Sequence, residues 1–171
     1  IAHDDTFRHT VITRHTGSGL YINNGSAGLE GCVIWSNRGH AVFMNGANLA
    51  VSNSVLYASG PTNVCYNGFT NTLISADYND IYLENEAAVA LFRGGPVDRL
   101  AEWTVTTTQD LHSLTYEPLF ADPTNDDYHL RSQTGRYDPS ARAFVTTDTN
   151  TSWLIDTGFQ NGSYSNEPMP N

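Results

Sequence analysis

The sequence predicts an all-β protein folded as a parallel β-helix, a solenoid of about four coils, and two repeated phrases lead to this class. A β-branched phrase recurs at steps of 22, 22 and 25 residues, and a second apolar phrase recurs at the same steps. Self-similarity at about 20 to 25 residues is typical of solenoids, whereas helical repeats need about 33 residues or more. Each run, bounded by Gly, Asn and Ser, is expected to form a strand stacked on its equivalent at about 4.8 Å.

The first phrase predicts one strand in each coil, at 10–13, 32–35, 54–57 and 79–82. Alternation along a strand then places one aliphatic residue of each copy in the interior: Ile12, Ile34, Leu56 and Ile81. The residues two positions earlier share that parity and are Thr10, Cys32, Ser54 and Asn79.

Another apolar or small residue precedes each inward aliphatic by five positions. These residues are Phe7, Leu29, Val51 and Ala76. Five is an odd step, so strict alternation would put the two residues of each coil on opposite faces. Both can point inward only if one turn residue between them interrupts the alternation. The residues placed to do so are His9, Gly31, Asn53 and Tyr78.

The second phrase predicts the partner strand, at 20–22, 42–44, 64–66 and 89–91. Its expected inward residues are Leu20, Val42, Val64 and Val89, followed by Ile22, Met44, Tyr66 and Leu91. We therefore expect continuous apolar columns through residues 1–92.

The repeat stops near residue 93, after the turn signal of Arg93-Gly94-Gly95-Pro96. Within 93–134 we expect a short helix over 97–107, with Trp103 packed on the outside of the last coil, and then returning strands at 118–120 and 128–130. Residues 135–171 are expected to form an irregular segment packed on the β-helix. The whole is predicted to be a single domain and a fragment of a longer chain.

The repeats and the tail carry a resemblance. Val51-Ser52-Asn53-Ser54-Val55-Leu56, with Gly19-Leu20-Tyr21-Ile22 as partner strand, resembles the right-handed parallel β-helix repeats of the pectate-lyase-like superfamily. The run from Glu117 to Pro123, followed by Tyr128-His129-Leu130-Arg131-Ser132, looks like the closing segment of secreted bacterial β-helix proteins. The resemblance implies the fold and an extracellular or cell-surface location. It leaves the activity open, because the superfamily includes lyases, epimerases, hydrolases and adhesins.

Charge and composition exclude several classes of partner. The net charge of −10 and the pI of about 4.7 disfavour nucleic acid, whose phosphates would be repelled. All eight basic residues are arginine, and there is no apolar run of about 18 residues, so we expect no membrane span. Cys32 and Cys65 differ in parity and coil, which predicts two buried free thiols.

The residues expected to bind a ligand are aromatic. Trp35, Tyr57 and Tyr82 occupy one repeat position, share outward parity and should stack at the coil spacing. Such a strip could hold the rings of a polysaccharide. The alternative is that the tail covers these rings and that they are ordinary packing.

Two other groups of residues have compositions that suit catalysis or metal binding. A polysaccharide lyase or epimerase needs a base and a cation, and consecutive coils offer these residue types in Arg14-His15 and in Arg38 and His40. No local motif of the resembling lyases matches, so no catalytic residue is assigned. Asp122, Asn125, Asp126 and Asp127 have a composition suited to Ca²⁺. Their spacing is not that of an EF-hand, and a turn that caps its own backbone is the preferred interpretation, without cofactor or metal.

Three functional hypotheses follow. The preferred one is a non-catalytic β-helix module of a secreted or cell-surface protein, acting as a structural spacer or a polysaccharide-contacting surface. The second is a fragment of a polysaccharide lyase or a related carbohydrate-active enzyme. The third is a subunit of a surface assembly, in which a neighbouring β-helix segment or another chain joins the open N-terminal coil.

Overall fold

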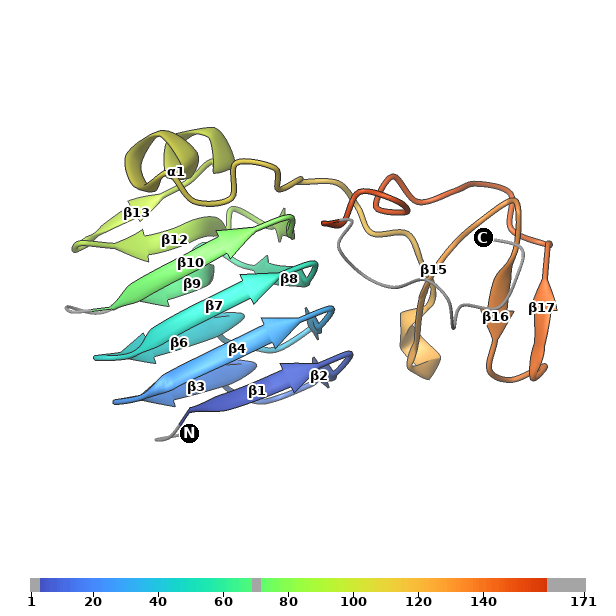
Figure 1. Cartoon of the computed structure of the whole chain (residues 1–171), viewed down its shortest axis with the longest axis horizontal. Coiled ribbons are helices and arrows are strands. Elements are labelled where there is room, and N and C mark those ends of the chain that lie inside the picture. Colours follow the sequence, from blue (N-terminus) through green and yellow to red (C-terminus); the bar gives the residue numbers. More distant parts are fainter. Residues whose placement is uncertain (1–3, 69–71, 160–171) are drawn as a thin grey trace. The chain divides into compact units, whose positions relative to one another are not determined.

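The chain forms a parallel β-solenoid with three strands in each coil, which confirms the predicted fold class (Figure 1). The computed structural model describes residues 4–68 and 72–159. Sheet A consists of β1 (Asp5–Arg8), β4 (Ser26–Glu30), β7 (Asn48–Ser52) and β10 (Leu73–Asp77). Sheet B consists of β2 (Val11–Thr13), β5 (Val33–Trp35), β8 (Val55–Ser59) and β11 (Asp80–Glu84). Sheet C consists of β3 (Leu20–Asn23), β6 (Val42–Asn45), β9 (Val64–Gly68), β12 (Ala88–Phe92) and the antiparallel β13 (Gly95–Val97).

The corner between sheets A and B is a single left-handed residue in every coil. The residues predicted to interrupt the alternation all have positive φ, at 48°, 61°, 51° and 57° for His9, Gly31, Asn53 and Tyr78. Because the corner is so short, the sheet A and sheet B strands are nearly continuous in sequence. This explains why the sequence pattern indicated two strands in each coil where the structure has three.

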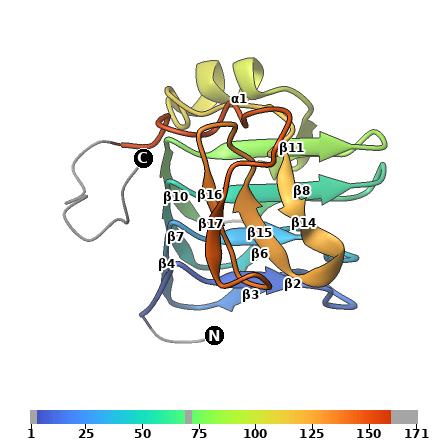
Figure 2. The same ribbon diagram turned by 90° about the vertical axis from the view of Figure 1, so that its right-hand side faces the viewer.

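The first phrase has the predicted register. Ile34, Leu56 and Ile81 are fully buried, and Val11↔Val33 and Val33↔Val55 are aligned on the other face. Figure 2 shows β11 above β8 within sheet B.

The predicted register of the second phrase is wrong in the third and fourth coils. Leu20 aligns with Val42 as expected, but Val42 aligns with Tyr66 instead of Val64, and Tyr66 aligns with Ala90 instead of Leu91. The physical reason is the corner between sheets B and C, which lengthens by two residues before β9. Leu91 is therefore half-buried beside Asn67, and Ala90 occupies the interior position that was predicted for Leu91.

Both cysteines are free and buried, as predicted. Cys32 lies inward at the end of the sheet A to sheet B corner, where its thiol contacts the carbonyl oxygen of Phe7 at 3.4 Å. Cys65 was assigned an outward position. It is instead fully buried near the start of β9, where its thiol lies 3.4 Å from the carbonyl oxygen of Leu56.

Helix α1 (Leu100–Thr107) covers the C-terminal end of the coil stack (Figure 1). Trp103 is fully buried, stacks on Tyr66 with ring centroids 5.5 Å apart and meets Phe92 edge-on at 5.4 Å. The expectations that the helix begins at Val97 and that Trp103 packs on the outside are therefore wrong. Val97 belongs to β13, because the Gly94-Gly95 turn lets the chain pair back onto β12 before the helix begins.

A second compact unit begins at Tyr116 and is described to residue 159. It contains the antiparallel pair β14 (Phe120–Asp122) and β15 (Asp127–Leu130), linked by the short 3₁₀ helix η1 (Pro123–Asn125), and the hairpin of β16 (Arg136–Asp138) and β17 (Ala143–Val145). The packing of the C-terminal segment on the β-helix stays a prediction, and residues 160–171 of that segment lie outside the described residues. None of the helices in the described ranges is long and apolar enough to cross a bilayer.

Candidate functional site

The outer face of sheet A carries an open groove of about 450 Å³. Its floor is a row of short side chains, one from each coil, in the aligned positions Thr6, Gly28, Ala50 and Ser75. A second aligned row, two residues further along each strand, adds Glu30, Ser52 and Asp77. Thr108 and Gln109 line the groove after helix α1, and Leu29, Val51 and Ala76 line it between the two rows. The groove therefore runs across the strands, parallel to the axis of the coil stack.

Each charged side chain along this groove is held by a defined partner. Arg8 Nε donates to Glu30 Oε2 at 2.7 Å. Asp77 Oδ1 accepts the backbone N–H groups of His112 at 2.7 Å and Tyr78 at 3.0 Å, and Asp77 Oδ2 lies 2.8 Å from His112 Nδ1. The His112 ring in turn stacks on Tyr78, with centroids 4.7 Å apart.

These partners keep both carboxyl groups ionised at neutral pH. The hydrogen bond and positive charge of Arg8 lower the pKa of Glu30. Partial burial raises the pKa of Asp77, but the hydrogen bonds from His112 and Tyr78 outweigh it, so the pKa lies below its usual value. The groove consequently presents carboxylate, hydroxyl and amide groups, most of which accept hydrogen bonds.

The predicted aromatic residues Trp35, Tyr57 and Tyr82 do come together on the outer face of sheet B. Ring centroids are 4.3 Å apart for Trp35 and Tyr57, 5.8 Å for Trp35 and Tyr82, and 5.9 Å for Tyr57 and Tyr82. The three rings therefore form a triangle of stacked rings, here called the aromatic cluster, in place of a linear ladder. Each ring covers part of the face of the other two, which leaves less ring surface for a ligand than a flat strip would.

Glu84 fixes the two tyrosines of the aromatic cluster. The Tyr57 hydroxyl donates to Glu84 Oε2 at 2.7 Å and the Tyr82 hydroxyl donates to Oε1 at 3.1 Å. Burial and the Glu84 carboxylate raise the pKa of Tyr57, so its hydroxyl stays protonated and remains a donor to Glu84.

The histidine considered for lyase chemistry, His40, has a structural role. Its Nδ1 accepts the backbone N–H of Val64 at 3.2 Å, and its Nε2 lies 2.7 Å from the Asn67 amide group. A neutral ring that accepts at Nδ1 carries its proton on Nε2, so Asn67 has to present Oδ1. If the Asn67 amide instead turned its Nδ2 toward His40, its Oδ1 would be buried without a hydrogen bond among the described residues. Burial also lowers the pKa of His40, which favours this neutral form.

The other three residues of that hypothesis lie in the corners between sheets B and C. Arg14 and His15 are exposed after β2, and Arg38 is exposed after β5. The backbone links the two corners, because the Arg38 N–H donates to the carbonyl oxygen of His15 at 3.0 Å. Both ring nitrogens of His40 are engaged, whereas His15 is exposed next to Arg14 in the sequence.

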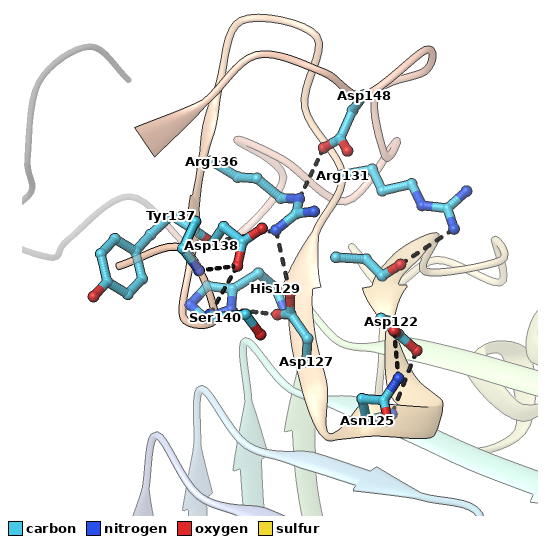
Figure 3. A network of polar contacts seen from close by, with 12 residues as sticks. Asp122, Asn125, Asp127, His129, Arg131, Arg136, Tyr137, Asp138, Ser140 and Asp148 are labelled. Carbon is cyan, nitrogen blue, oxygen red and sulfur yellow. Dashed lines mark hydrogen bonds and ion pairs between the residues drawn. The ribbon is translucent and has the colours of Figure 1, made fainter. Parts of the chain in front are cut away.

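The acidic turn considered for calcium binds its own backbone and neighbouring side chains. Asp122 accepts from the backbone N–H and the side-chain amide of Asn125, at 3.4 and 2.7 Å, and so caps η1 (Figure 3). Asp127 is engaged by Arg136 and His129, and Asp126 has a left-handed backbone. No group of three or more His, Cys, Asp or Glu side chains gathers for a metal ion within residues 4–68 and 72–159.

The second unit contains a charged network that the sequence did not predict. Figure 3 shows the Arg136 guanidinium between Asp148 and Asp127, with Nε 2.9 Å from Asp148 Oδ2 and Nη1 3.2 Å from Asp127 Oδ2. Asp127 Oδ1 lies 2.6 Å from His129 Nδ1, and Asp148 also accepts the Ser132 N–H at 2.9 Å. This network joins β15, β16 and the segment near residue 148. We assign His129 a structural role, because its Nδ1 is bound to Asp127 and its ring meets that of Tyr137 edge-on.

Comparison of the chain with protein-family models, with curated proteins and with solved structures finds no match. Function is therefore inferred from the residues and the fold alone. The groove on sheet A was missed at the sequence level, although a signal was present. Thr6, Gly28, Ala50 and Ser75 recur at steps of 22, 22 and 25, and their small size marks a shallow line on the outer face.

Proposed function

We propose that this chain is a non-catalytic β-helix module of a secreted or cell-surface protein and that it contacts a polysaccharide along the groove on sheet A. The groove is the observation that carries the proposal. It is open, its floor has no bulky side chain, and it spans four adjacent strands, a length of about 14 Å at the usual strand spacing. An extended polymer can lie across such a surface without threading into a pocket.

The charges along the groove favour a neutral glycan over an acidic one. The Glu30 and Asp77 carboxylates can accept hydrogen bonds from sugar hydroxyls, and Ser52 and Gln109 can both accept and donate. A uronate or sulfated chain would instead meet these carboxylates on a protein whose net charge is −10.

The groove lacks the pair of groups that glycan cleavage needs. A glycosidase requires one carboxyl group that stays protonated, with a raised pKa, whereas the pKa values of both Glu30 and Asp77 are lowered. A lyase requires a free base and a cation for the substrate carboxylate. Here Arg8 is bound to Glu30 and His112 is bound to Asp77.

The proposed location rests on the resemblance of the repeats and the tail. The likeness to pectate-lyase-like β-helix repeats and to the tail of secreted bacterial proteins points to the outside of the cell. The acidic composition agrees with that assignment.

Affinity electrophoresis through gels cast with neutral and acidic polysaccharides tests the proposal. We compare the wild-type chain with Ala50→Trp, which fills the groove floor, and with Trp35→Ala, which opens the aromatic cluster. Ala101→Trp, on the exposed side of α1, is the matched control for adding an indole. Circular dichroism and thermal unfolding verify that each variant is folded.

We expect neutral polysaccharide to retard the wild-type chain and Ala101→Trp, and we expect Ala50→Trp to lose that retardation. Loss in Trp35→Ala alone would move the contact to the aromatic cluster. Absence of retardation in every gel would contradict glycan binding and leave the role of a structural spacer.

A further inference from the structure

The hairpin of β16 and β17 has one exposed aromatic face and one half-buried face. Tyr137 and Phe144 are paired directly across the two strands and are 40% and 41% exposed. Arg136 and Val145, the next pair along the hairpin, are half-buried. Because side chains alternate along a strand, both rings point to the exposed face and Arg136 points to the opposite one.

Ion pairs on the half-buried face hold the hairpin in place. Figure 3 shows the Arg136 guanidinium between Asp127 and Asp148, and the Arg136 side chain is only 14% exposed. At the turn of the hairpin, Asp138 Oδ1 accepts the Ser140 N–H at 2.8 Å. These contacts fix the two strands without using the exposed rings. A ligand would therefore meet a preformed surface, and its binding would cost little conformational entropy.

The exposed face combines two rings, a gap and a hydroxyl group. The ring centroids of Tyr137 and Phe144 are 6.2 Å apart with planes at 64°, and the His129 ring meets Tyr137 edge-on. Gly135 leaves room beside Phe144, since a Cβ there would lie 3.9 Å from Phe144 Cδ1 and 3.4 Å from Thr146 Cγ2. Thr146 is exposed. We call the surface of Gly135, Tyr137, Phe144 and Thr146 the aromatic hairpin face, and all four residues are uncharged.

This composition suits a neutral sugar. The C–H face of a sugar ring packs on an aromatic ring, and the hydroxyls of Tyr137 and Thr146 can donate to and accept from sugar hydroxyl groups. An anionic ligand would meet no positive side chain among these four residues, on a chain with a net charge of −10. An organic cation would be attracted by the rings, but the same four residues provide no carboxylate to pair with it.

The aromatic hairpin face is too small for a protein partner. At 40% and 41% exposure, the two rings present on the order of 200 Å². A specific protein interface covers about 800 Å² on each partner. One or two sugar rings match the smaller area.

We propose that the aromatic hairpin face is a second glycan-contact site, on which a neutral sugar ring packs against Tyr137 and Phe144 while its hydroxyl groups bind Thr146. The ligand class rests on the proposed function, but the site lies in the second unit and shares no residue with the groove on sheet A. Sugar at the two sites can therefore be detected separately.

An NMR titration of the whole folded chain locates the sugar. The probes are soluble neutral oligosaccharides prepared from cellulose, starch and galactomannan. Backbone amide signals of residues 135–146 report on the aromatic hairpin face, and those of residues 28, 50 and 75 report on the groove. Light scattering gives the mass of the chain in the same buffer.

Four variants separate the ring from the rest of the hairpin. Tyr137→Leu removes one ring, and Tyr137→Phe keeps the ring and removes only its hydroxyl. Thr146→Arg leaves both rings in place and adds a long side chain beside Phe144. Tyr21→Leu is the matched control, because Tyr21 is another exposed tyrosine on the outer face of a strand. Circular dichroism verifies that each variant is folded.

We expect at least one oligosaccharide to shift the amides of residues 135–146. Tyr137→Leu should raise the dissociation constant about fivefold to tenfold, which corresponds to the loss of one stacked ring. Thr146→Arg should also weaken binding, because its side chain competes for the surface of Phe144. Tyr137→Phe and Tyr21→Leu should bind nearly as tightly as the wild type.

Unchanged amides in residues 135–146 with every oligosaccharide, or equal affinity of Tyr137→Leu and Tyr21→Leu, would overturn the hairpin site. Shifts confined to the groove would do the same and leave the proposed function intact. Shifts confined to the hairpin would support the site and contradict the groove.

Two further results would assign the rings to another occupant and so overturn the proposal. One is displacement of the sugar by tetramethylammonium chloride, which would indicate an organic cation. The other is a dimer that Phe144→Leu dissociates, which would indicate a second copy of the chain.

Discussion

The indole N–H of Trp103 donates a hydrogen bond to Asp110 Oδ2 at 2.9 Å, and both residues are almost completely buried. The other carboxylate oxygen of Asp110 accepts from Asn79 Nδ2 at 3.0 Å and from Ser113 Oγ at 2.6 Å. One carboxylate thus joins the helix that covers the stack to Asn79 inside the last coil.

Replacing Asp110 by Ala should lower the free energy of unfolding by about 3 kcal/mol. The substitution leaves the Trp103 N–H and an Asn79 N–H buried without their acceptor, which costs more than the lost hydrogen bonds themselves. Urea unfolding measures the change, with the exposed Asp98→Ala as control. Equal stability of the two variants would show that this carboxylate does not hold the end of the stack together.

Replacing Leu56 by Ala should cost about 2–5 kcal/mol, because Leu56 is fully buried in the central column. Val55→Ala, the neighbouring substitution on the outer face of β8, should cost at most about 1 kcal/mol. The comparison uses the denaturant midpoints of both variants. If Val55→Ala proves the more damaging substitution, the inward and outward faces of sheet B have been exchanged.

His40 should make stability fall as the pH drops below about 6.5. Burial lowers the pKa of the folded-state imidazole below 6.5, so the unfolded chain binds the proton more readily. The stabilisation is complete above the unfolded-state pKa and is lost as the pH falls from that value through the folded-state pKa. Melting temperatures between pH 8 and pH 5 should decline less in His40→Gln than in the wild type, and parallel curves would contradict the assignment.

Neither cysteine should react in the folded protein. Cys32 and Cys65 are buried, and burial, together with the Asp80 and Asp110 carboxylates, raises the pKa of the Cys65 thiol well above its usual value. Ellman's reagent at pH 8 should therefore label no thiol in the native chain and both thiols in guanidinium chloride. Rapid labelling of Cys65 without denaturant would mean that the start of β9 opens readily.

The sequence was most informative where structure repeats. The 22-residue step, the inward columns through Ile34 and Leu56, and the left-handed corners at Gly31 and Asn53 are each determined within one coil and repeated in the next. That Trp35, Tyr57 and Tyr82 are neighbours was predicted for the same reason, since equal repeat positions on one face must be neighbours, but they form a triangle and not the expected ladder. The capping of η1 by Asp122 was also predictable, because it is a contact within four residues.

Other features depend on contacts that no period encodes. The corner before β9 is longer by two residues, which is an even number. Alternation places Val64 and Tyr66 on the same face of the strand, so it cannot tell which of them aligns with Val42. Whether Trp103 lies outside the stack or over its end depends on how the Gly94-Gly95 turn directs the chain. The ion pairs of Arg136 with Asp127 and Asp148 join positions that belong to no repeat.

By itself, then, the sequence determined the coil, its period and its interior, because these arise from alternation and turn chemistry within about 22 residues. Only the tertiary structure decided the third-coil register, the position of Trp103 over the end of the stack, and the groove on sheet A. These depend on how loops of unequal length bring distant side chains together, and a linear pattern does not contain that information.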